Sequence, residues 1–245
     1  MSVEVAIYIL NALLYSIVIL LDVLVMWAAV KTRETSRNFI FHILFTAMIL
    51  DVAVHFVTIF HDVPSYFLNQ DFSTVGTTYV YVLILCLQWF AQLLFLPLLS
   101  IIHFLAIFSP AKFRKASHRH FACANAVVIL LALILTAPHF TKYSGYTYLL
   151  PGHFWYFDFA KPYSYIYQHL NVTLQIICVV FVVVADTLII WKICSLRKKH
   201  KITLPKRDGT QKKHQVVKEV RLALNFLVLS VCFLIMTIFY NVNFG

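Results

Sequence analysis

The chain has 245 residues, of which 61% are hydrophobic and 12% are charged, and its formal net charge is +10. A water-soluble domain carries about 25% charged residues. One soluble core of this length cannot hide so much apolar surface, so the composition excludes an ordinary soluble protein. The basic residues gather beside apolar runs, which excludes nucleic-acid binding as the reason for the positive charge.

Six runs along the chain are apolar and long enough to cross a bilayer, which takes about 20 residues in a helix. The first run lacks a basic leader and a small-residue cleavage site, so we expect a retained helix and not a signal peptide. The sequence therefore predicts an all-α, polytopic membrane bundle with a single domain over residues 1–245. Its predicted helices lie near residues 5–30, 39–60, 77–108, 121–140, 165–194 and 220–240.

The distribution of Lys and Arg predicts the orientation of these helices. Of the 20 Lys and Arg residues, all but Lys142 and Lys161 lie in the first, third and fifth connections or at the helix ends beside them. The positive-inside rule places those connections in the cytoplasm and the N-terminus outside. The fifth connection, 195–219, is the most basic, and it either sets the topology alone or also faces anionic lipid and a cytoplasmic partner.

Three acidic residues fall inside the apolar runs, where a charge is costly. They are Asp22, Asp51 and Asp186, and no Lys or Arg lies deep enough in any run to pair with them. Two readings stay open: a structural network between helices, or a polar switch or ion site. Asp51 lies nearest the middle of its run and is the principal candidate for a switch.

Two of the predicted helices carry a stripe of polar residues at helical spacing. In 77–108, Tyr81, Gln88 and Gln92 are separated by seven and four residues. In 165–194, Gln168, Asn171 and Gln175 are separated by three and four residues, so each stripe occupies one helix face. Such stripes either line a shared ligand cavity or form interhelical hydrogen bonds. The aromatic-rich connection 141–164 is either an interfacial belt or partly a lid. The predicted ligand-binding residues are Tyr81, Gln88, Gln92, Asn171 and Gln175.

The end of the third apolar run, 77–108, resembles a pattern from a known class of protein. Residues 102–110 read IHFLAIFSP, which resembles the pattern N-R-F-x-A-I-x-x-P that closes helix 3 of nematode serpentine chemoreceptors. These are G-protein-coupled receptors of the Srg superfamily, which includes the srx and srv classes. The stretch Arg37-Asn38-Phe39, which leads to Asp51, is similar to the start of helix 2 in that group. The resemblance extends over most of the chain.

The resemblance implies a chemosensory receptor that binds a small external ligand and signals through a heterotrimeric G protein. It also implies a multi-pass protein of the plasma membrane, in the cilia of sensory neurons, with seven helices of which this chain shows six. We expect no cofactor, no metal and no catalytic residue. The residues expected to contact the G protein are His103, Lys112, Arg197, Lys198 and Lys199.

Three features depart from the family pattern. His103 stands in place of an arginine, and histidine is not a permanent cation near neutral pH. The family has seven helices whereas this sequence predicts six, as a fragment of a longer receptor would, and no cysteine is placed to form the disulfide common in rhodopsin-like receptors. A non-signalling truncated receptor is therefore one alternative. A proton- or cation-coupled transporter is another, favoured by the three acids but opposed by the few glycines and the absence of a repeat.

Overall fold

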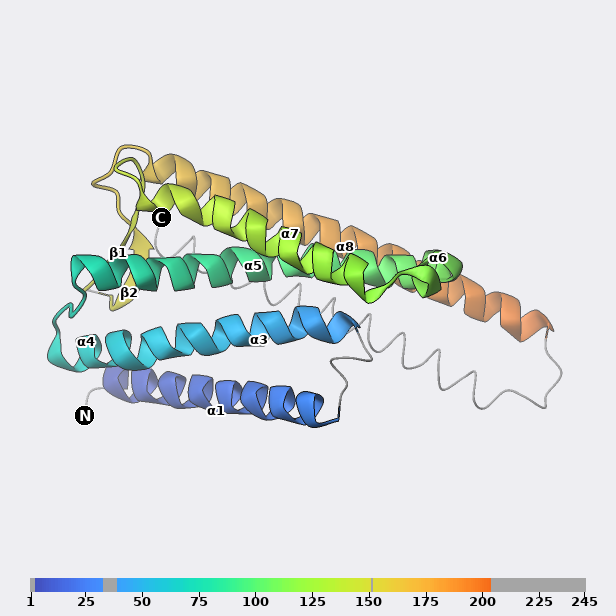
Figure 1. Cartoon of the computed structure of the whole chain (residues 1–245), viewed down its shortest axis with the longest axis horizontal. Coiled ribbons are helices and arrows are strands. Elements are labelled where there is room, and N and C mark those ends of the chain that lie inside the picture. Colours follow the sequence, from blue (N-terminus) through green and yellow to red (C-terminus); the bar gives the residue numbers. More distant parts are fainter. Residues whose placement is uncertain (1–2, 33–38, 151, 204–245) are drawn as a thin grey trace. The chain divides into compact units, whose positions relative to one another are not determined.

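The computed structural model describes residues 3–32, 39–150 and 152–203, with the course of the chain shown in Figure 1. The chain divides into two units. The first comprises Met1–Gln92 and His118–Gln168, and the second comprises Leu93–Ser117 and His169–Gly245. Two long helices, α5 (Val75–Phe108) and α8 (Ser164–Thr203), each contribute to both units.

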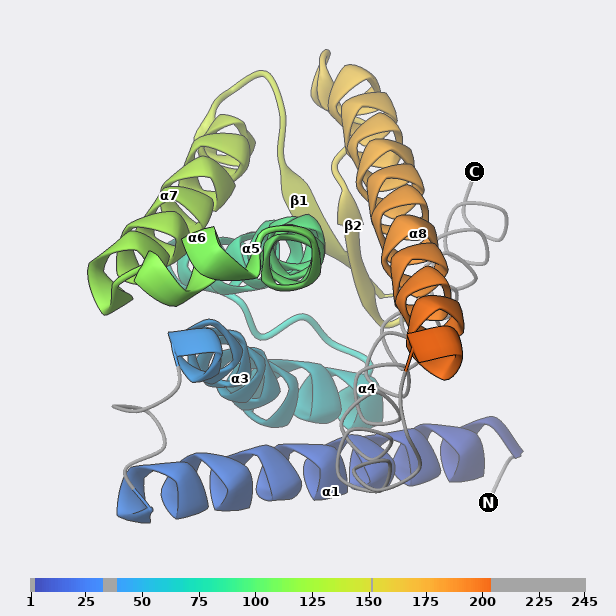
Figure 2. The same ribbon diagram turned by 90° about the vertical axis from the view of Figure 1, so that its right-hand side faces the viewer.

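The first unit is built on packed helices. α1 (Val3–Lys31) packs along α3 (Phe39–Val57), and α3 packs against α7 (His118–Thr136), as Figures 1 and 2 show. The second helical stretch does not end at residue 60 as predicted. It continues through a π-helix, η1 (Thr58–Asp62), into α4 (Val63–Leu68), and Asn69 closes it in the left-handed conformation. α7 ends in a 3-10 turn, η2 (Ala137–Phe140).

A β-hairpin occupies the predicted connection 141–164 of the first unit. Strand β1 (Tyr146–Leu149) pairs antiparallel with β2 (Phe154–Phe157). Aromatic residues oppose each other across the strands, a pairing that stabilises sheets. The base of the hairpin is tied because the Lys161 ammonium donates to the carbonyl oxygens of Thr141 and Ser144, each at 3.1 Å. No strand was predicted here.

The second unit contains the later part of α5, the short helix α6 (Pro110–Lys115) and most of α8. Ile189 and Ile193 of α8 are 1% and 3% exposed and form a hydrophobic core cluster of the second unit. Phe104 and Ile107 of α5 pack against them. α8 has 40 residues, about 60 Å of helix, which is roughly twice the thickness of the hydrocarbon layer. α8 ends at Thr203 and so includes the beginning of the segment 195–219, which was predicted to be a loop.

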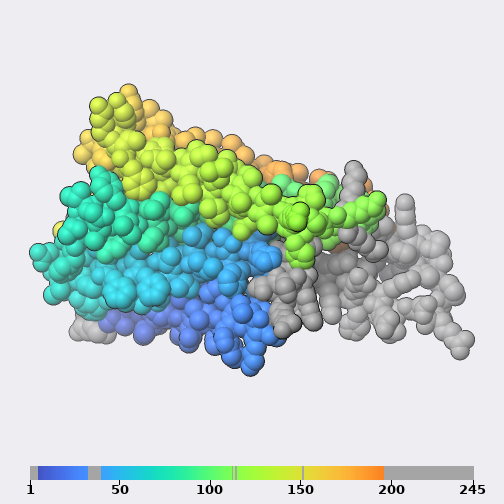
Figure 3. All heavy atoms as spheres, in the orientation of Figure 1, coloured from blue at the N-terminus to red at the C-terminus, as the bar shows by residue number. Residues whose placement is uncertain are grey.

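Five helical segments of the described chain are long and apolar enough to cross a membrane. α1 exposes apolar side chains around most of its surface, including Leu13 at 57% and Trp27 at 61%, and Figure 3 shows α1 (blue) at the surface. Lipid is the solvent that such a helix requires. The predicted helix at 220–240 lies outside the described residues. The segments are Val5–Lys31, Ile40–Leu68, Val75–Phe108, His118–Phe140 and Ser164–Ser195.

Candidate functional site

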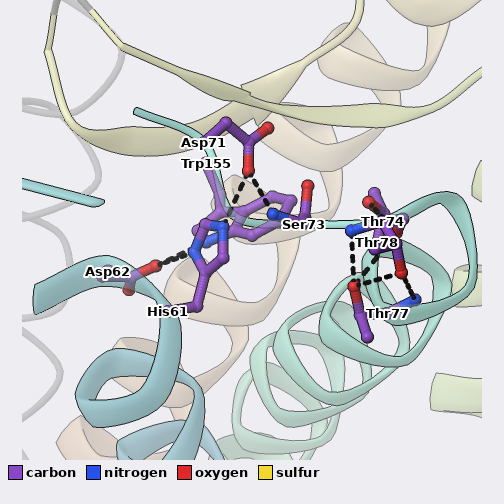
Figure 4. Close-up of polar contacts among 8 residues, drawn as sticks. All are labelled: His61, Asp62, Asp71, Ser73, Thr74, Thr77, Thr78 and Trp155. Carbon is purple, nitrogen blue, oxygen red and sulfur yellow. Dashed lines mark hydrogen bonds and ion pairs between the residues drawn. The ribbon is translucent and has the colours of Figure 1, made fainter. Parts of the chain in front are cut away.

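A buried histidine bridges two carboxylates in the first unit, at the end of the unit that carries the hairpin. The His61 ring is 1% exposed; its Nδ1 lies 2.9 Å from Asp62 Oδ1 and its Nε2 lies 2.9 Å from Asp71 Oδ1. Figure 4 shows the ring held between the two acids. We call this group and its aromatic neighbours the His61 cluster: His61, Asp62, Asp71, Tyr81, Tyr148 and Trp155.

The hydrogen bonds define the charge of the cluster. When both carboxylates are ionised they only accept hydrogen bonds, so both ring nitrogens of His61 donate and the ring is then an imidazolium. Two carboxylates and one imidazolium leave one net negative charge. Burial acts to raise the pKa of Asp71, but hydrogen bonds from His61 and from the Ser73 backbone N–H, at 2.8 Å, outweigh it. The pKa of Asp71 therefore lies below its ordinary value.

Aromatic side chains from the hairpin and from α5 enclose the imidazolium. The ring of Tyr148 lies 4.8 Å from that of His61, and the rings of Tyr81 and Trp155 lie 5.1 Å away. Tyr148 and Trp155 are directly opposite each other across the hairpin, so their side chains share one sheet face. The Trp155 indole N–H also donates to Asp62 Oδ1 at 2.9 Å.

The local backbone explains how His61 reaches these partners. The π-helix η1 contains both His61 and Asp62 and interrupts the regular α-helix of the second span. Such π-turns are rare and occur frequently at functional sites. Sequence reasoning did not single out His61, which directly follows the predicted helix 39–60. The available signal was a His-Asp pair at the end of an apolar run.

A second polar group of the first unit surrounds the predicted switch, Asp51 on α3. Its Oδ1 accepts hydrogen bonds from the side-chain amides of Gln88, at 2.8 Å, and of Gln92, both on α5. Asp22 on α1 interacts electrostatically with the same carboxylate. α5 thus places the predicted residue Tyr81 at His61 and the predicted residues Gln88 and Gln92 at Asp51.

The remaining predicted pocket residues and the third acid lie in the second unit. Asp186 is 1% exposed; the Ser100 hydroxyl donates to its Oδ1 at 3.3 Å, and its Oδ2 has no partner among the described residues. Gln175 is 1% exposed, and its amide atoms also have no partner in the described part of the chain. Asn171 is 5% exposed. A ligand pocket shared by Asn171 and Gln175 with the α5 residues stays a prediction.

The predicted G-protein contacts are only partly visible. His103 lies on α5 and is partly buried. The side chains of Lys112, Arg197, Lys198 and Lys199 lie outside the described residues, although the backbone places Lys112 in α6 and the other three in α8.

The His61 cluster is not a metal centre in this arrangement, because both imidazole nitrogens are engaged by carboxylates. Within residues 3–32, 39–150 and 152–203, no three His, Cys, Asp or Glu side chains are arranged to hold a metal ion. Comparison of the chain with protein-family models and with curated proteins finds no match.

Proposed function

We propose that the chain is a serpentine, G-protein-coupled membrane receptor that binds a small external ligand at the His61 cluster. One observation carries the proposal. A single helix, α5, contacts the His61 cluster through Tyr81 and holds the intramembrane acid Asp51 through Gln88 and Gln92. A ligand that shifts Tyr81 therefore acts on the same rigid element that holds Asp51.

The spacing along α5 supports this coupling. Gln88 and Gln92 follow Tyr81 by seven and eleven residues, or about 10 and 16 Å along the helix axis. A small rotation of α5 changes the contact of Tyr81 with His61 and the two amide bonds to Asp51 together. An ionisable group inside a membrane is a functional candidate by default, and the Asp51 carboxylate is held by the amides of Gln88 and Gln92.

The charge distribution supports the orientation. Asp62, Asp71 and Asp158 lie in the second and fourth predicted connections, whereas all Lys and Arg residues but Lys142 and Lys161 lie in or beside the first, third and fifth. By the positive-inside rule the His61 cluster faces outward at the plasma membrane. The end of α5 at His103, with Lys112 and residues 197–199, then contacts the G protein inside.

Proton- or cation-coupled transport is a second candidate, favoured by one observation. Asp22 and Asp51 interact electrostatically, and no described Lys or Arg is paired with either. Two carboxylates without a basic partner suit uptake of a proton or a cation. Purified chain in sealed vesicles tests this candidate: transport predicts a proton flux that Asp51→Asn abolishes, whereas equal fluxes in both preparations eliminate it.

The receptor proposal is tested by G-protein activation in cells without added ligand. The chain is compared with its His103→Arg variant, which restores the permanent cation of the resembled family. His120→Arg, at the start of α7, is the matched control. At equal surface expression we expect His103→Arg alone to raise basal activation. Equal activation by all three chains contradicts the proposal.

A further inference from the structure

We infer that the His61 cluster binds a small organic cation through the carboxylates of Asp62 and Asp71. The inference rests on the proposed function only in that it uses the same site. It concerns the chemical class of the ligand that this site binds. Three independent features of the described structure support this inference. They are the remaining acceptor sites of Asp62 and Asp71, a buried hydroxyl without a partner, and the aromatic rings that surround the site.

The two carboxylates retain acceptor capacity after the bridge is formed. Asp62 Oδ1 accepts from His61 and Trp155, and Asp71 Oδ1 accepts from His61 and the Ser73 backbone, while the Ser73 side chain adds a further hydrogen bond to Asp71. An ionised carboxylate offers about four acceptor sites, so both acids can accept further hydrogen bonds. The Asp62 and Asp71 side chains are 17% and 34% exposed, whereas His61 is 1% exposed. A ligand can therefore reach the acids without displacing the imidazolium.

Tyr148 supplies the second feature. It is 6% exposed, its ring contacts His61, and its hydroxyl has no hydrogen-bond partner among the described residues. Burial raises the pKa of Tyr148, and the charges of Asp62 and Asp71 raise it further, so the phenol lies within electrostatic reach of both acids. A buried hydroxyl without a partner is unfavourable unless a ligand satisfies it. Ser65, one turn beyond His61, is 0% exposed and is unpartnered in the same described region.

The sign of the charge identifies the class of ligand. The bridge leaves one net negative charge, which disfavours an anion. The two hairpin lysines do not neutralise it: Lys142 lies over the Tyr143 ring, and Lys161 donates to backbone carbonyls. The rings of Tyr81, Tyr148 and Trp155 favour a cation through their faces. A neutral apolar ligand leaves the remaining acceptor sites of both acids and the Tyr148 hydroxyl without partners, so an ammonium compound fits best.

Thermal unfolding of the purified full chain tests the inference at neutral pH. Two ammonium probes are each compared with a neutral molecule of similar shape: phenethylammonium with 2-phenylethanol, and choline with 3,3-dimethyl-1-butanol. We expect a saturable rise in the unfolding midpoint with at least one ammonium probe and none with its neutral counterpart, because bound ligand stabilises the folded state. The inference is overturned if neither ammonium probe exceeds its neutral counterpart.

Substitutions locate the binding. Asp71→Asn should weaken the apparent affinity about tenfold, and Tyr148→Phe should weaken it several-fold while keeping the ring. Asp158→Asn and Tyr143→Phe remove the same groups elsewhere in the connection 141–164 and should leave the affinity unchanged. Unchanged affinity in both Asp71→Asn and Tyr148→Phe refutes the assigned site, and Tyr148→Phe keeps the test valid if Asp71→Asn unfolds.

The two proposals fail separately. Saturable ammonium binding with no G-protein activation by any variant supports the cation site and contradicts the receptor proposal. Basal activation by His103→Arg without any ammonium-specific shift supports the receptor proposal and overturns the cation site.

Discussion

The His61 cluster joins η1, the α4–α5 connection and the hairpin. His61 lies in η1 beside Asp62 and bonds Asp71 of the α4–α5 connection, and the Trp155 indole of the hairpin donates to Asp62. Removing one member of a buried charged group leaves its partner uncompensated, which is far more costly than replacing the whole group. The hairpin end of the first unit should therefore respond to single substitutions at these residues.

Asp71 predicts a dependence of stability on pH. Its pKa is lower in the folded protein than in the unfolded chain, so its contribution is present above the unfolded pKa and is lost as pH falls through the folded pKa. We expect the difference in unfolding midpoint between the chain and Asp71→Asn to shrink as pH is lowered from 7 to about 3. Asp158→Asn is the control. A difference that stays constant over this range contradicts the role of Asp71.

The indole N–H of Trp155 gives a second prediction at the residue scale. Trp155→Phe removes the donor to Asp62 but keeps an aromatic ring in the hairpin. Because hydrogen bonds to charged groups contribute about 1.5–3 kcal/mol, the free energy of unfolding should fall by about that amount. Trp191→Phe, at a side chain that is 64% exposed on α8, should have a much smaller effect. Equal losses in the two variants contradict this assignment.

At the scale of elements, one hydrogen bond joins α3 to α7. The Asn125 amide donates to the Thr46 hydroxyl at 2.9 Å. A double-mutant cycle with Thr46→Val and Asn125→Leu should give a coupling of about 0.6 kcal/mol, and at most about 1.7 kcal/mol, as such bonds do between membrane helices. A coupling indistinguishable from zero means that the two helices are held by apolar packing alone.

In the second unit, substitution of Asp186 is expected to raise stability, whereas the substitutions at the His61 cluster are expected to lower it. It is 1% exposed, and Ser100 is its only hydrogen-bond donor among the described residues. Replacing a poorly satisfied buried acid by an apolar residue of similar size is often stabilising. We expect Asp186→Leu to raise the unfolding midpoint, and Ser100→Ala to have no further effect in that background. A lower midpoint in Asp186→Leu shows that the carboxyl is satisfied by an interaction outside the described residues.

The elements differ in how far the sequence predicts them. The five described spans follow from the length of their apolar runs, because a membrane-crossing helix leaves few other solutions. The hairpin was missed because its strands have four residues each and their aromatic residues fit an interfacial belt equally well. Likewise, helical periodicity puts Gln88 and Gln92 on one face of α5, but it does not name Asp51 as their partner.

At the scale of the whole molecule, function and stability make different demands on the chain. Apolar side chains cover α1 and suit lipid, whereas the polar groups around His61, Asp51 and Asp186 are costly in a membrane. The proposed receptor uses the first two groups, connected by α5, as a route from the hairpin end toward the membrane interior. Each group is adjacent to α5, the helix that ends at Phe108.

The most direct test asks whether the His61 cluster is coupled to the cytoplasmic end. It measures basal G-protein activation in the His103→Arg background, with and without Asp71→Asn. Asp71→Asn weakens the bridge between η1 and the α4–α5 connection, so helix rearrangement becomes easier, and we predict higher basal activation at equal surface expression. Asp158→Asn in the same background should leave it unchanged. If activation is the same with and without Asp71→Asn, the His61 cluster is not coupled to the cytoplasmic end, and the central claim is contradicted.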